Sequence, residues 1–275
     1  MEVNILLENN SIDTRFKTKH GLSILINYMG KMILLDVWPD KKFIDNAIKM
    51  NLDLTKVERL FLSHAHYDHT RGLNDFIKIN NNAVIYLMDN INNRYYSKRY
   101  GWLNISIGLK LRKKYQSKIN QTSSDLIIDN CIYFLKNTVN KYQKPASNRS
   151  LFKMDNKRII PDTFDHEGIL VFEDNNELII FNSCSHNGLL NIIETVEAKI
   201  PDKKIRSYIG GLHLSNPTTQ KHESNEYLDM LTSNLKQKDI CVYTGHCTGK
   251  YAFDYLKENL KDKIQVINTG MRLNV

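Results

Sequence analysis

The sequence predicts an α/β protein in which two sheets form the core and helices cover them. Apolar runs of strand length alternate along the chain with stretches of helical spacing, which is the pattern of that class. Residues 168–172 and 177–181 are apolar strands joined by the turn residues 174–176, which predicts a hairpin. The chain has 275 residues, 41% of them hydrophobic, and is long enough for one large core. We therefore expect a single domain over residues 1–275 that carries an insertion.

The individual elements follow from periodicity and turn residues. Phe43, Ile44, Ala47 and Ile48 show helical spacing, and residues 29–31 form a tight turn between two strands. Residues 125–137 and 150–161 are read as strands and turns. The other predicted strands span residues 2–8, 23–28, 32–37, 57–62, 83–88, 168–172, 177–181, 208–213 and 240–244, and the predicted helices span 43–50, 73–79, 189–196, 223–235 and 251–260.

The composition excludes several classes of protein. No run of about eighteen apolar residues occurs, so we expect no membrane span and no membrane partner. Residues 1–8 carry an acid and lack the basic region of a secretory signal. Four cysteines without a CxxC pair are typical of a reducing compartment, so the expected location is cytoplasmic. The formal charge of +8 favours acidic partners but identifies none.

Four metal-capable side chains fall within six residues, namely His64, His66, Asp68 and His69. They follow a predicted buried strand and precede a helical stretch that starts at Leu73, which places them on a strand-to-helix loop. His64 and His66, two apart on extended chain, can share one ion, while Asp68 and His69 turn toward a second position. Imidazole and carboxylate ligands suit zinc, iron or manganese, and open positions at such a site permit hydrolytic chemistry.

The HxHxDH spacing of residues 64–69 resembles that of the metallo-β-lactamase superfamily. Three later motifs extend the resemblance over nearly the whole chain: Cys-Ser-His-Asn-Gly at 184–188, Gly-Gly-Leu-His-Leu at 210–214 and Thr-Gly-His-Cys-Thr-Gly at 244–249. They look like the motifs of one branch, the dihydropterin-ribofuranosylaminobenzene-phosphate synthase-like metal-dependent hydrolases. The resemblance implies an αββα sandwich with a dinuclear metal site at one edge of its sheets.

The resemblance also implies a ligand set for two divalent ions, with zinc preferred over manganese or iron. Cys184 lies near the place where the superfamily has a bridging Asp or a thiolate, so it is a possible ligand, although a lone Cys equally fits core packing. Asp36 is implied to orient the metal loop by hydrogen bonds, and capping of the following helix is the alternative. The implied ligands are His64, His66 and His186 for the first ion and Asp68, His69 and His246 for the second.

Two residues are expected to act during catalysis. Asp68 would orient the attacking hydroxide or accept a proton, besides binding metal. His213 follows two glycines that let the backbone approach closely, and it would stabilise developing charge or protonate the leaving group. A further metal bond or a structural role for His213 stays open. His166 is a rival to His186 as metal ligand, ranked lower because the motif at 184–188 is closer to the branch.

The sequence departs from the family at two positions near this loop. Trp38 replaces the small residue that usually stands close after Asp36, which puts the shape of that turn in doubt. Arg71 stands where relatives usually carry Gly, and its long side chain could contact an anionic substrate or extend to solvent.

Residues 90–160 are expected to form a helical, basic insertion that caps the site. Within 90–124, eight Lys or Arg residues interleave with aromatic residues and no acid occurs. Such a mixture can hold phosphate oxygens and stack on a planar ring, and a solvated segment with Lys on its outer face is the alternative. The first candidates for substrate binding are Arg94, Tyr95, Tyr96 and Arg99, besides Arg71. The eight basic residues are Arg94, Lys98, Arg99, Lys110, Arg112, Lys113, Lys114 and Lys118.

Together these features predict a metal-dependent hydrolase that acts on a small anionic, phosphate-bearing molecule, with phosphoester hydrolysis as the preferred reaction. Three alternatives stay open. One is a pterin-related transferase or synthase of the same branch. Another is nucleic-acid processing on the same metal core, which ranks below a small-molecule substrate because no recognition helix or RNA module is visible. The third is a metal-containing binding protein without turnover.

Overall fold

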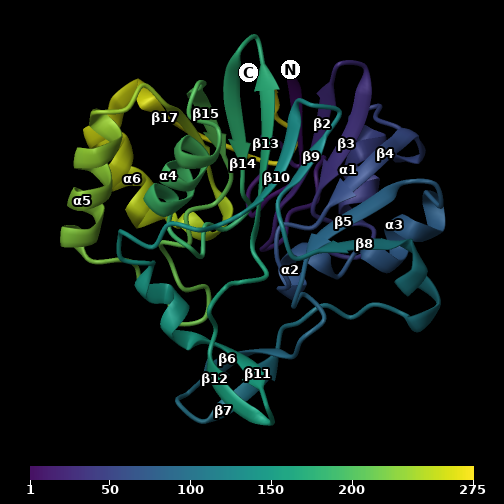
Figure 1. The fold of residues 1–275 in the computed structure, drawn as a ribbon, viewed down its shortest axis with the longest axis horizontal. Coiled ribbons are helices and arrows are strands. Elements are labelled where there is room, and N and C mark those ends of the chain that lie inside the picture. The colour runs from purple at the N-terminus through teal and green to yellow at the C-terminus, as the bar shows by residue number, and fades with distance from the viewer.

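The computed structural model describes residues 1–275, with the side chains of Lys113 and Lys114 excepted. These two lysines belong to the predicted basic insertion. The part of that prediction that concerns their side chains lies outside the described residues. Two seven-stranded sheets stand face to face, and helices cover the outer face of each (Figure 1). The predicted αββα sandwich is therefore confirmed.

The first sheet comes from the N-terminal part of the chain and is closed by the last strand. Its β1, β2 and β3 pair antiparallel, whereas β3, β4, β5 and β8 run parallel, so these four strands end at the same edge. In sheet order the strands are β18 (Arg272–Asn274), β1 (Glu2–Leu7), β2 (Ser23–Tyr28), β3 (Lys31–Leu35), β4 (Val57–Phe61), β5 (Val84–Met88) and β8 (Ile119–Thr122).

The second sheet repeats this division into antiparallel and parallel parts. Its β9, β10, β13 and β14 are antiparallel, and β14, β15, β16 and β17 are parallel. The predicted hairpin of residues 168–181 is confirmed as β13 and β14. In sheet order the strands are β17 (Ile264–Val266), β16 (Cys241–Thr244), β15 (Lys204–Ile209), β14 (Glu177–Phe181), β13 (Gly168–Asp174), β10 (Ile132–Lys136) and β9 (Leu126–Ile128).

Three apolar layers hold these elements together. Between the sheets, Phe61 of β4 meets Phe134 of β10 with ring centroids 5.2 Å apart, and both rings are fully buried. Burial of an aromatic ring of this size contributes about 1.5–3 kcal/mol. None of the helices in the described residues has the length and apolar content needed to traverse a bilayer. The outer layers are formed by α1 (Lys42–Lys49) and α3 (Leu73–Ile79) on the first sheet and by α4 (Leu189–Lys199), α5 (Asn225–Lys236) and α6 (Lys250–Leu260) on the second.

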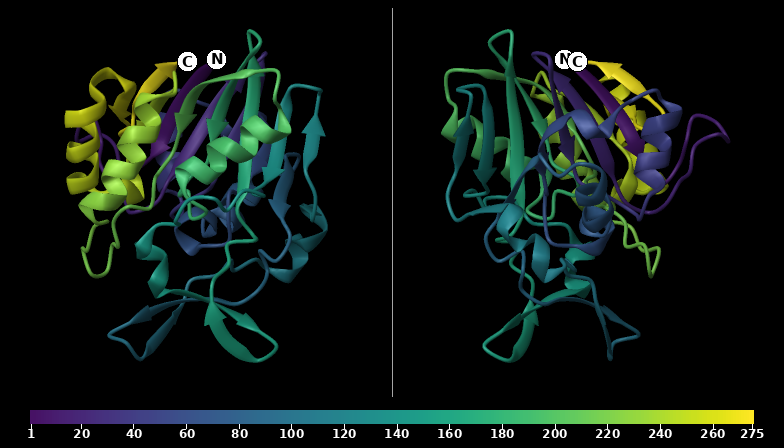
Figure 2. Two further views of the ribbon diagram at one scale, coloured as in Figure 1. Left: turned by 60° about the vertical axis from the view of Figure 1, so that its left-hand side comes forward. Right: turned by 90° about the vertical axis from the view of Figure 1, so that its right-hand side faces the viewer.

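The insertion is built mainly of strands, with only short 3-10 helices such as Ala146–Ser150, so the prediction of a helical insertion was wrong. A separate four-stranded antiparallel sheet, which we call the cap, projects from one end of the sandwich (Figures 1 and 2). Aromatic residues are favoured in β-strands, and here Tyr96 lies opposite Phe152 in a cross-strand pair. The cap strands, in order, are β12 (Arg158–Pro161), β11 (Leu151–Asp155), β6 (Tyr95–Arg99) and β7 (Leu103–Ser106).

The cap does not use all of residues 90–160. Strands β8, β9 and β10 lie inside that range but extend the two main sheets. The cap is therefore made by two hairpins that are distant in sequence and joined by the pairing of β6 with β11. Between the cap and the sandwich lies the edge at which the parallel strands of both sheets end (Figure 1). That edge carries the four histidine motifs.

Candidate metal centre

The first ligand group joins the two sheets. His64 and His66 follow β4, and His186 follows β14, and one ligand atom from each lies within 4.8 Å of the others. Nε2 of His64 is 3.3 Å from Nε2 of His186, and all three side chains are buried. Nε2 of His66 has no hydrogen-bond partner and lies 3.6 Å from a carboxylate oxygen of Asp162.

The neighbours of His64 and His186 fix which ring nitrogen carries the proton. The Ser63 hydroxyl donates to Asp36, so at 2.8 Å it accepts a hydrogen bond from Nδ1–H of His64. The amide nitrogen of Asn148 donates to the carbonyl of His186, so its oxygen accepts Nδ1–H of His186 at 2.9 Å. Both Nε2 atoms therefore present lone pairs to each other. Two acceptors at this distance repel each other unless a metal ion or a shared proton lies between them.

The second group shows the same arrangement. Nδ1–H of His69 donates to Asp36 over 2.9 Å, and Nδ1–H of His246 donates to the side-chain oxygen of Asn9 over 3.2 Å. The Nε2 atoms of His69 and His246 lie 3.2 Å apart. A carboxylate oxygen of Asp68 lies 3.7 Å from the first and 3.8 Å from the second. Asp68, His69 and His246 thus direct a carboxylate and two imidazole Nε2 atoms toward one point.

Cys184 lies between the two groups. Its sulfur is 3.1 Å from Nε2 of His69, and its sulfur and the nitrogens of His64 and His69 lie within 4.8 Å of one another. The sulfur of Cys247 is 3.4 Å from that of Cys184. Burial raises the pKa of the Cys184 thiol well above its usual value. A neighbouring divalent cation acts in the opposite direction and favours the thiolate.

His213 is buried, and both of its ring nitrogens lack a hydrogen-bond partner. Its ring lies 4.1 Å from that of His186 between centroids, and its backbone N–H points to the sulfur of Cys247 at 3.2 Å. The residue adopts φ = 51°, so the chain turns sharply after the two glycines. A Cβ atom on Gly210 would lie 1.8 Å from the carbonyl oxygen of Asn182, which explains why the strand end needs glycine there.

Burial and mutual repulsion keep most of these imidazoles neutral. Burial lowers the pKa of His64, His186 and His246 well below the ordinary value and lowers that of His213 to about 3. His69 differs: burial alone would lower its pKa, but Asp68 and Asp36 raise it. Neutral imidazoles, a carboxylate and a thiol are the donors that divalent zinc takes in proteins, and this donor set fits such ions.

A model of the metallo-β-lactamase superfamily matches residues 18–110, a range that includes the cluster from His64 to His69. The chain carries a domain of this superfamily. It is 27% identical to the 7,8-dihydropterin-6-methyl-4-(beta-D-ribofuranosyl)-aminobenzene-5'-phosphate synthase of Methanocaldococcus jannaschii, over 93% of this chain and 90% of the relative. An uncharacterized protein of the same archaeon is also 27% identical, over 93% of this chain and 94% of its own length.

A solved structure agrees with these relatives. It is that of a metal-dependent hydrolase of the β-lactamase superfamily, and it superposes with a TM-score of 0.80 at 22% sequence identity. The superposition covers 100% of this chain and 99% of that one, so the two share the fold throughout. The resemblance to the superfamily inferred from the four motifs is confirmed.

Asp36 and His166 are buried beside the candidate ligands and form hydrogen bonds with the loop that carries them. Asp36, at φ = 58°, accepts hydrogen bonds from Ser63 and His69, which is the orienting position implied by the resemblance. His166 accepts the N–H of Ala65 through Nδ1 and lies 3.1 Å from Asp162 through Nε2. Because both nitrogens of His166 have partners, it supports the loop, and His186 is the histidine that faces His64.

The structure adds His20 to the site, to which the sequence assigned no role. Nε2 of His20 lies 3.5 Å from Asp68, and the imidazole ring is 4.5 Å from that of His246 between centroids. His20, Asp68 and His246 form a further group whose ligand atoms lie within 4.8 Å. The sequence contains little indication of this role, because His20 stands in a polar loop. The His-Gly-Leu-Ser stretch that begins at His20 is nevertheless part of the resemblance to the family.

The predicted substrate-binding residues lie in different places. Arg99 and Tyr67 line a cavity of about 430 Å³ that opens onto the metal centre. Tyr95 is fully buried, and its hydroxyl donates to the carbonyl of Asn90. Tyr96 is half-buried in the cap, and Arg94 is exposed. The guanidinium of Arg71 lies over the ring of Trp38 at 5.7 Å, so the two departures from the family contact each other.

Proposed function

We propose that this chain is a hydrolase with two adjacent divalent ions, zinc in the first place, that acts on a small anionic, phosphate-bearing molecule. The observation that carries the proposal is the pair of facing Nε2 lone pairs at 3.3 Å and 3.2 Å, each fixed by an outer acceptor of Nδ1–H. The ligands would be His64, His66 and His186 for one ion and Asp68, His69 and His246 for the other, with Cys184 between them.

Two ions at such a site supply a nucleophile from water at neutral pH and polarise the scissile oxygen. Asp68 is ionised there: burial alone would raise its pKa, but His69 and His20 lower it. An ionised Asp68 accepts a hydrogen bond from the attacking water and orients it. Its side chain is 16% exposed, so it can be reached from the cavity.

His213 has a defined role in this scheme. With a pKa of about 3 it is neutral at pH 7 and cannot serve as a strong acid there. A neutral imidazole still donates one N–H, and both nitrogens of His213 are without partners. We therefore assign His213 to hydrogen bonding with the charge that develops on the substrate, and we assign Arg99 to the substrate's anionic group.

The first test is the metal content of the purified chain, measured by elemental analysis without chelator. About two ions per chain are expected, falling toward one or none in His64→Ala and His246→Ala. His222→Ala, which removes an imidazole outside both ligand groups, is the matched control and should keep the full content. A folded chain that holds no ion after reconstitution would contradict the proposal.

A second candidate function is group transfer. It rests on the relative at 27% identity over 93% of the chain, which is a synthase that joins a pterin and a ribosyl-aminobenzene phosphate according to its name. The same metal centre would then promote the transfer of a group from one substrate to a second substrate in place of water. Incubation of the metal-loaded protein with phosphodiester and phosphomonoester substrates, with product analysis by mass spectrometry, separates hydrolysis from transfer.

A further inference from the structure

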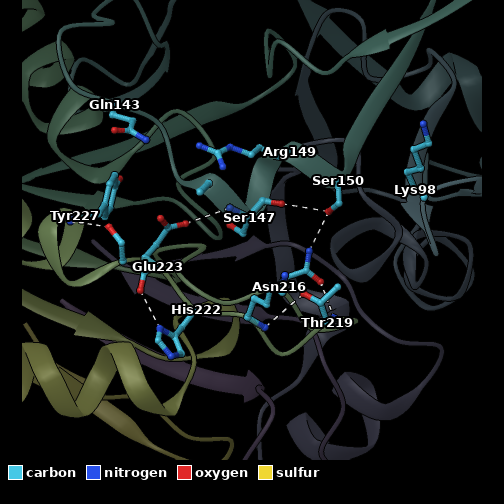
Figure 3. A pocket seen from close by; sticks show the side chains of 14 residues that line it. Lys98, Gln143, Ser147, Arg149, Ser150, Asn216, Thr219, His222, Glu223 and Tyr227 are labelled. Atoms are coloured by element: carbon cyan, nitrogen blue, oxygen red, sulfur yellow. Dashed lines mark hydrogen bonds between the residues drawn. The ribbon is translucent and has the colours of Figure 1, made fainter.

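A second cavity of about 580 Å³ adjoins the metal cavity (Figure 3). Ser147, Ser150 and Asn216 line both cavities, so they form the boundary between them. The remaining walls come from β6 of the cap, from the loop that leads into α5, and from Tyr227 in the first turn of that helix. None of the proposed metal ligands lines this cavity.

The boundary is a short helix that faces both sites. Within residues Ala146–Ser150, Asn148 accepts Nδ1–H of His186 on the metal side. On the other side, the Ser150 hydroxyl accepts a hydrogen bond from Asn216 at 3.0 Å and lies 3.2 Å from the carbonyl of Ser147 (Figure 3). A group bound in the second cavity would therefore be held at a fixed position relative to the metal ligands.

The charge of this second cavity is positive. Lys98, Arg149 and Lys221 line it, and Glu223 is its one acidic lining residue. Among the described residues, no carboxylate lies within 4.0 Å of these three cationic groups. Elsewhere on the surface, cations such as Lys238 lie 2.7 Å from an acid. In the cavity, Lys98 instead lies over the ring of Phe152 at 5.5 Å, and Arg149 acts on Glu223 only against the larger effect of burial, which raises the pKa of that carboxyl.

The single acid offsets only part of this charge, because three cationic side chains line the cavity with it. Glu223 is only 3% exposed, and its carboxylate accepts the backbone N–H of Ser147 at 3.1 Å (Figure 3). Its oxygen thus serves the start of the short helix, where a negative charge is favourable. Serine, threonine and asparagine side chains make up much of the rest of the lining, so the cavity suits a polar, hydrated ligand better than an apolar one.

We propose that the second cavity binds an anionic group of the substrate, a phosphate or carboxylate, at the end of the molecule remote from the bond that is broken. This proposal rests on the proposed function for the identity of the substrate, but the cavity's affinity for anions does not. Lys98, Arg149 and Lys221 supply charge-assisted hydrogen bonds, and Ser147 and Ser150, which line both cavities, lie between the two ends. The substrate is then a polar molecule with two separated ends. One end is anionic and binds in the second cavity, and the other binds at the metal centre.

The test uses the zinc-loaded protein, inorganic phosphate as the probe, and backbone amide shifts measured by NMR. Phosphate is expected to shift two sets of amides: one at the metal centre, and one that includes Ser147, Ser150 and Thr219. In the double variant Arg149→Ala/Lys221→Ala, affinity at the second set should fall roughly tenfold, which corresponds to about 1.4 kcal/mol. The first set should titrate as before. Lys204→Ala/Lys236→Ala, which removes two exposed cations outside the cavity, is the matched control and should leave both sets unchanged.

Three results would overturn the inference. They are a second set that titrates equally in the double variant, a second set weakened as much by the control variant, and the absence of any shift at Ser147, Ser150 and Thr219. The variant His64→Ala separates this inference from the proposed function. It should lose the shifts at the metal centre and keep those of the second cavity, and the second cavity should bind phosphate even if no hydrolysis is found.

Discussion

The sulfur atoms of Cys184 and Cys247 lie 3.4 Å apart at the bottom of the candidate metal centre, and both cysteines are buried. Their surroundings differ. Cys184 faces His69 at 3.1 Å, whereas Cys247 accepts the backbone N–H of His213 and supports the loop that carries it. Cys184 therefore faces the candidate ligands of the histidine loop, whereas Cys247 supports the loop of His213, although both sulfurs also lie within 4.8 Å of a ring nitrogen of His213.

This difference predicts distinct spectra for two cysteine variants. Protein loaded with cobalt(II) should show a sulfur-to-metal charge-transfer absorption in the near ultraviolet, because Cys184 is placed to bind as a thiolate. The absorption should disappear in Cys184→Ser and persist in Cys247→Ser, which keeps a similar volume. Loss of the absorption in Cys247→Ser alone would assign the metal bond to the other sulfur.

Asp36→Asn should weaken metal binding without unfolding the chain. Asn tolerates the left-handed backbone at this position, where φ is 58°, and keeps the size of the side chain. It loses the charge that holds Nδ1–H of His69 and the Ser63 hydroxyl. We expect metal affinity to fall 10–100-fold, the range seen when partners of ligating histidines are removed. Competition with a chromogenic chelator measures the effect, and an unchanged affinity would contradict the orienting role.

The stability of the metal-free protein should fall as the pH drops below about 6.5. His213 has a folded pKa of about 3, whereas in the unfolded chain it takes up a proton near pH 6.5. The unfolded state therefore binds more protons between these two values, and the free energy of unfolding decreases by on the order of 1 kcal/mol per pH unit over that window. The contribution of His213 to the free energy of unfolding is fully present above pH 6.5.

Thermal unfolding of chelator-treated protein between pH 7.5 and pH 5 checks this prediction. His213→Gln, which cannot titrate, should show a shallower decrease than the unaltered chain. His69 contributes with the opposite sign, because its raised pKa gives stability that is lost as the pH rises through it. Equal slopes for His213→Gln and the unaltered chain would show that His213 does not stay neutral in the folded state.

Arg99→Ala should raise the KM for an anionic substrate about tenfold, with unchanged metal content. The side chain lines the metal cavity, and a charge-assisted hydrogen bond from it would be lost. Arg94→Ala is the matched control, because Arg94 is exposed at the start of the same cap strand. Steady-state kinetics on any substrate found for the chain makes the comparison, and equal effects of the two substitutions would remove Arg99 from the binding site.

Much of the fold, and the gathering of the candidate ligands at one edge, could be predicted because the information is local. His64, His66, Asp68 and His69 are close in sequence, and each later histidine follows an apolar strand whose end is visible from its composition. The sandwich follows for a similar reason, since strands and helices of ordinary length are separated by clear turns. The approach of His186 to His64 matched the expectation from the family motif.

The features that sequence analysis missed depend on contacts between distant residues. His20 reaches Asp68 only because the loop after β1 folds back over the metal loop, and nothing near His20 in the sequence signals this. The insertion is predicted to be helical, but its cap is a four-stranded sheet. Pairing of β6 with β11 joins segments about fifty residues apart, and short-range periodicity does not reveal such pairing. Trp38 and Arg71 were each noted as departures, but their stacking shows only in three dimensions.

The contact of the residues that follow β1 with His246 has a consequence for how the protein is synthesised. Glu8 accepts the backbone N–H of His246, and Asn9 accepts its Nδ1–H, across separations of 238 and 237 residues. At the opposite end of the sandwich, the two termini meet where β1 pairs with β18 (Figure 2). During translation the early histidines, His64 to His69, leave the ribosome long before their last partner exists. If the second ligand group binds an ion as proposed, its full set of ligands exists only after nearly all of the chain has been synthesised, so completion of that site would be a late step of biogenesis.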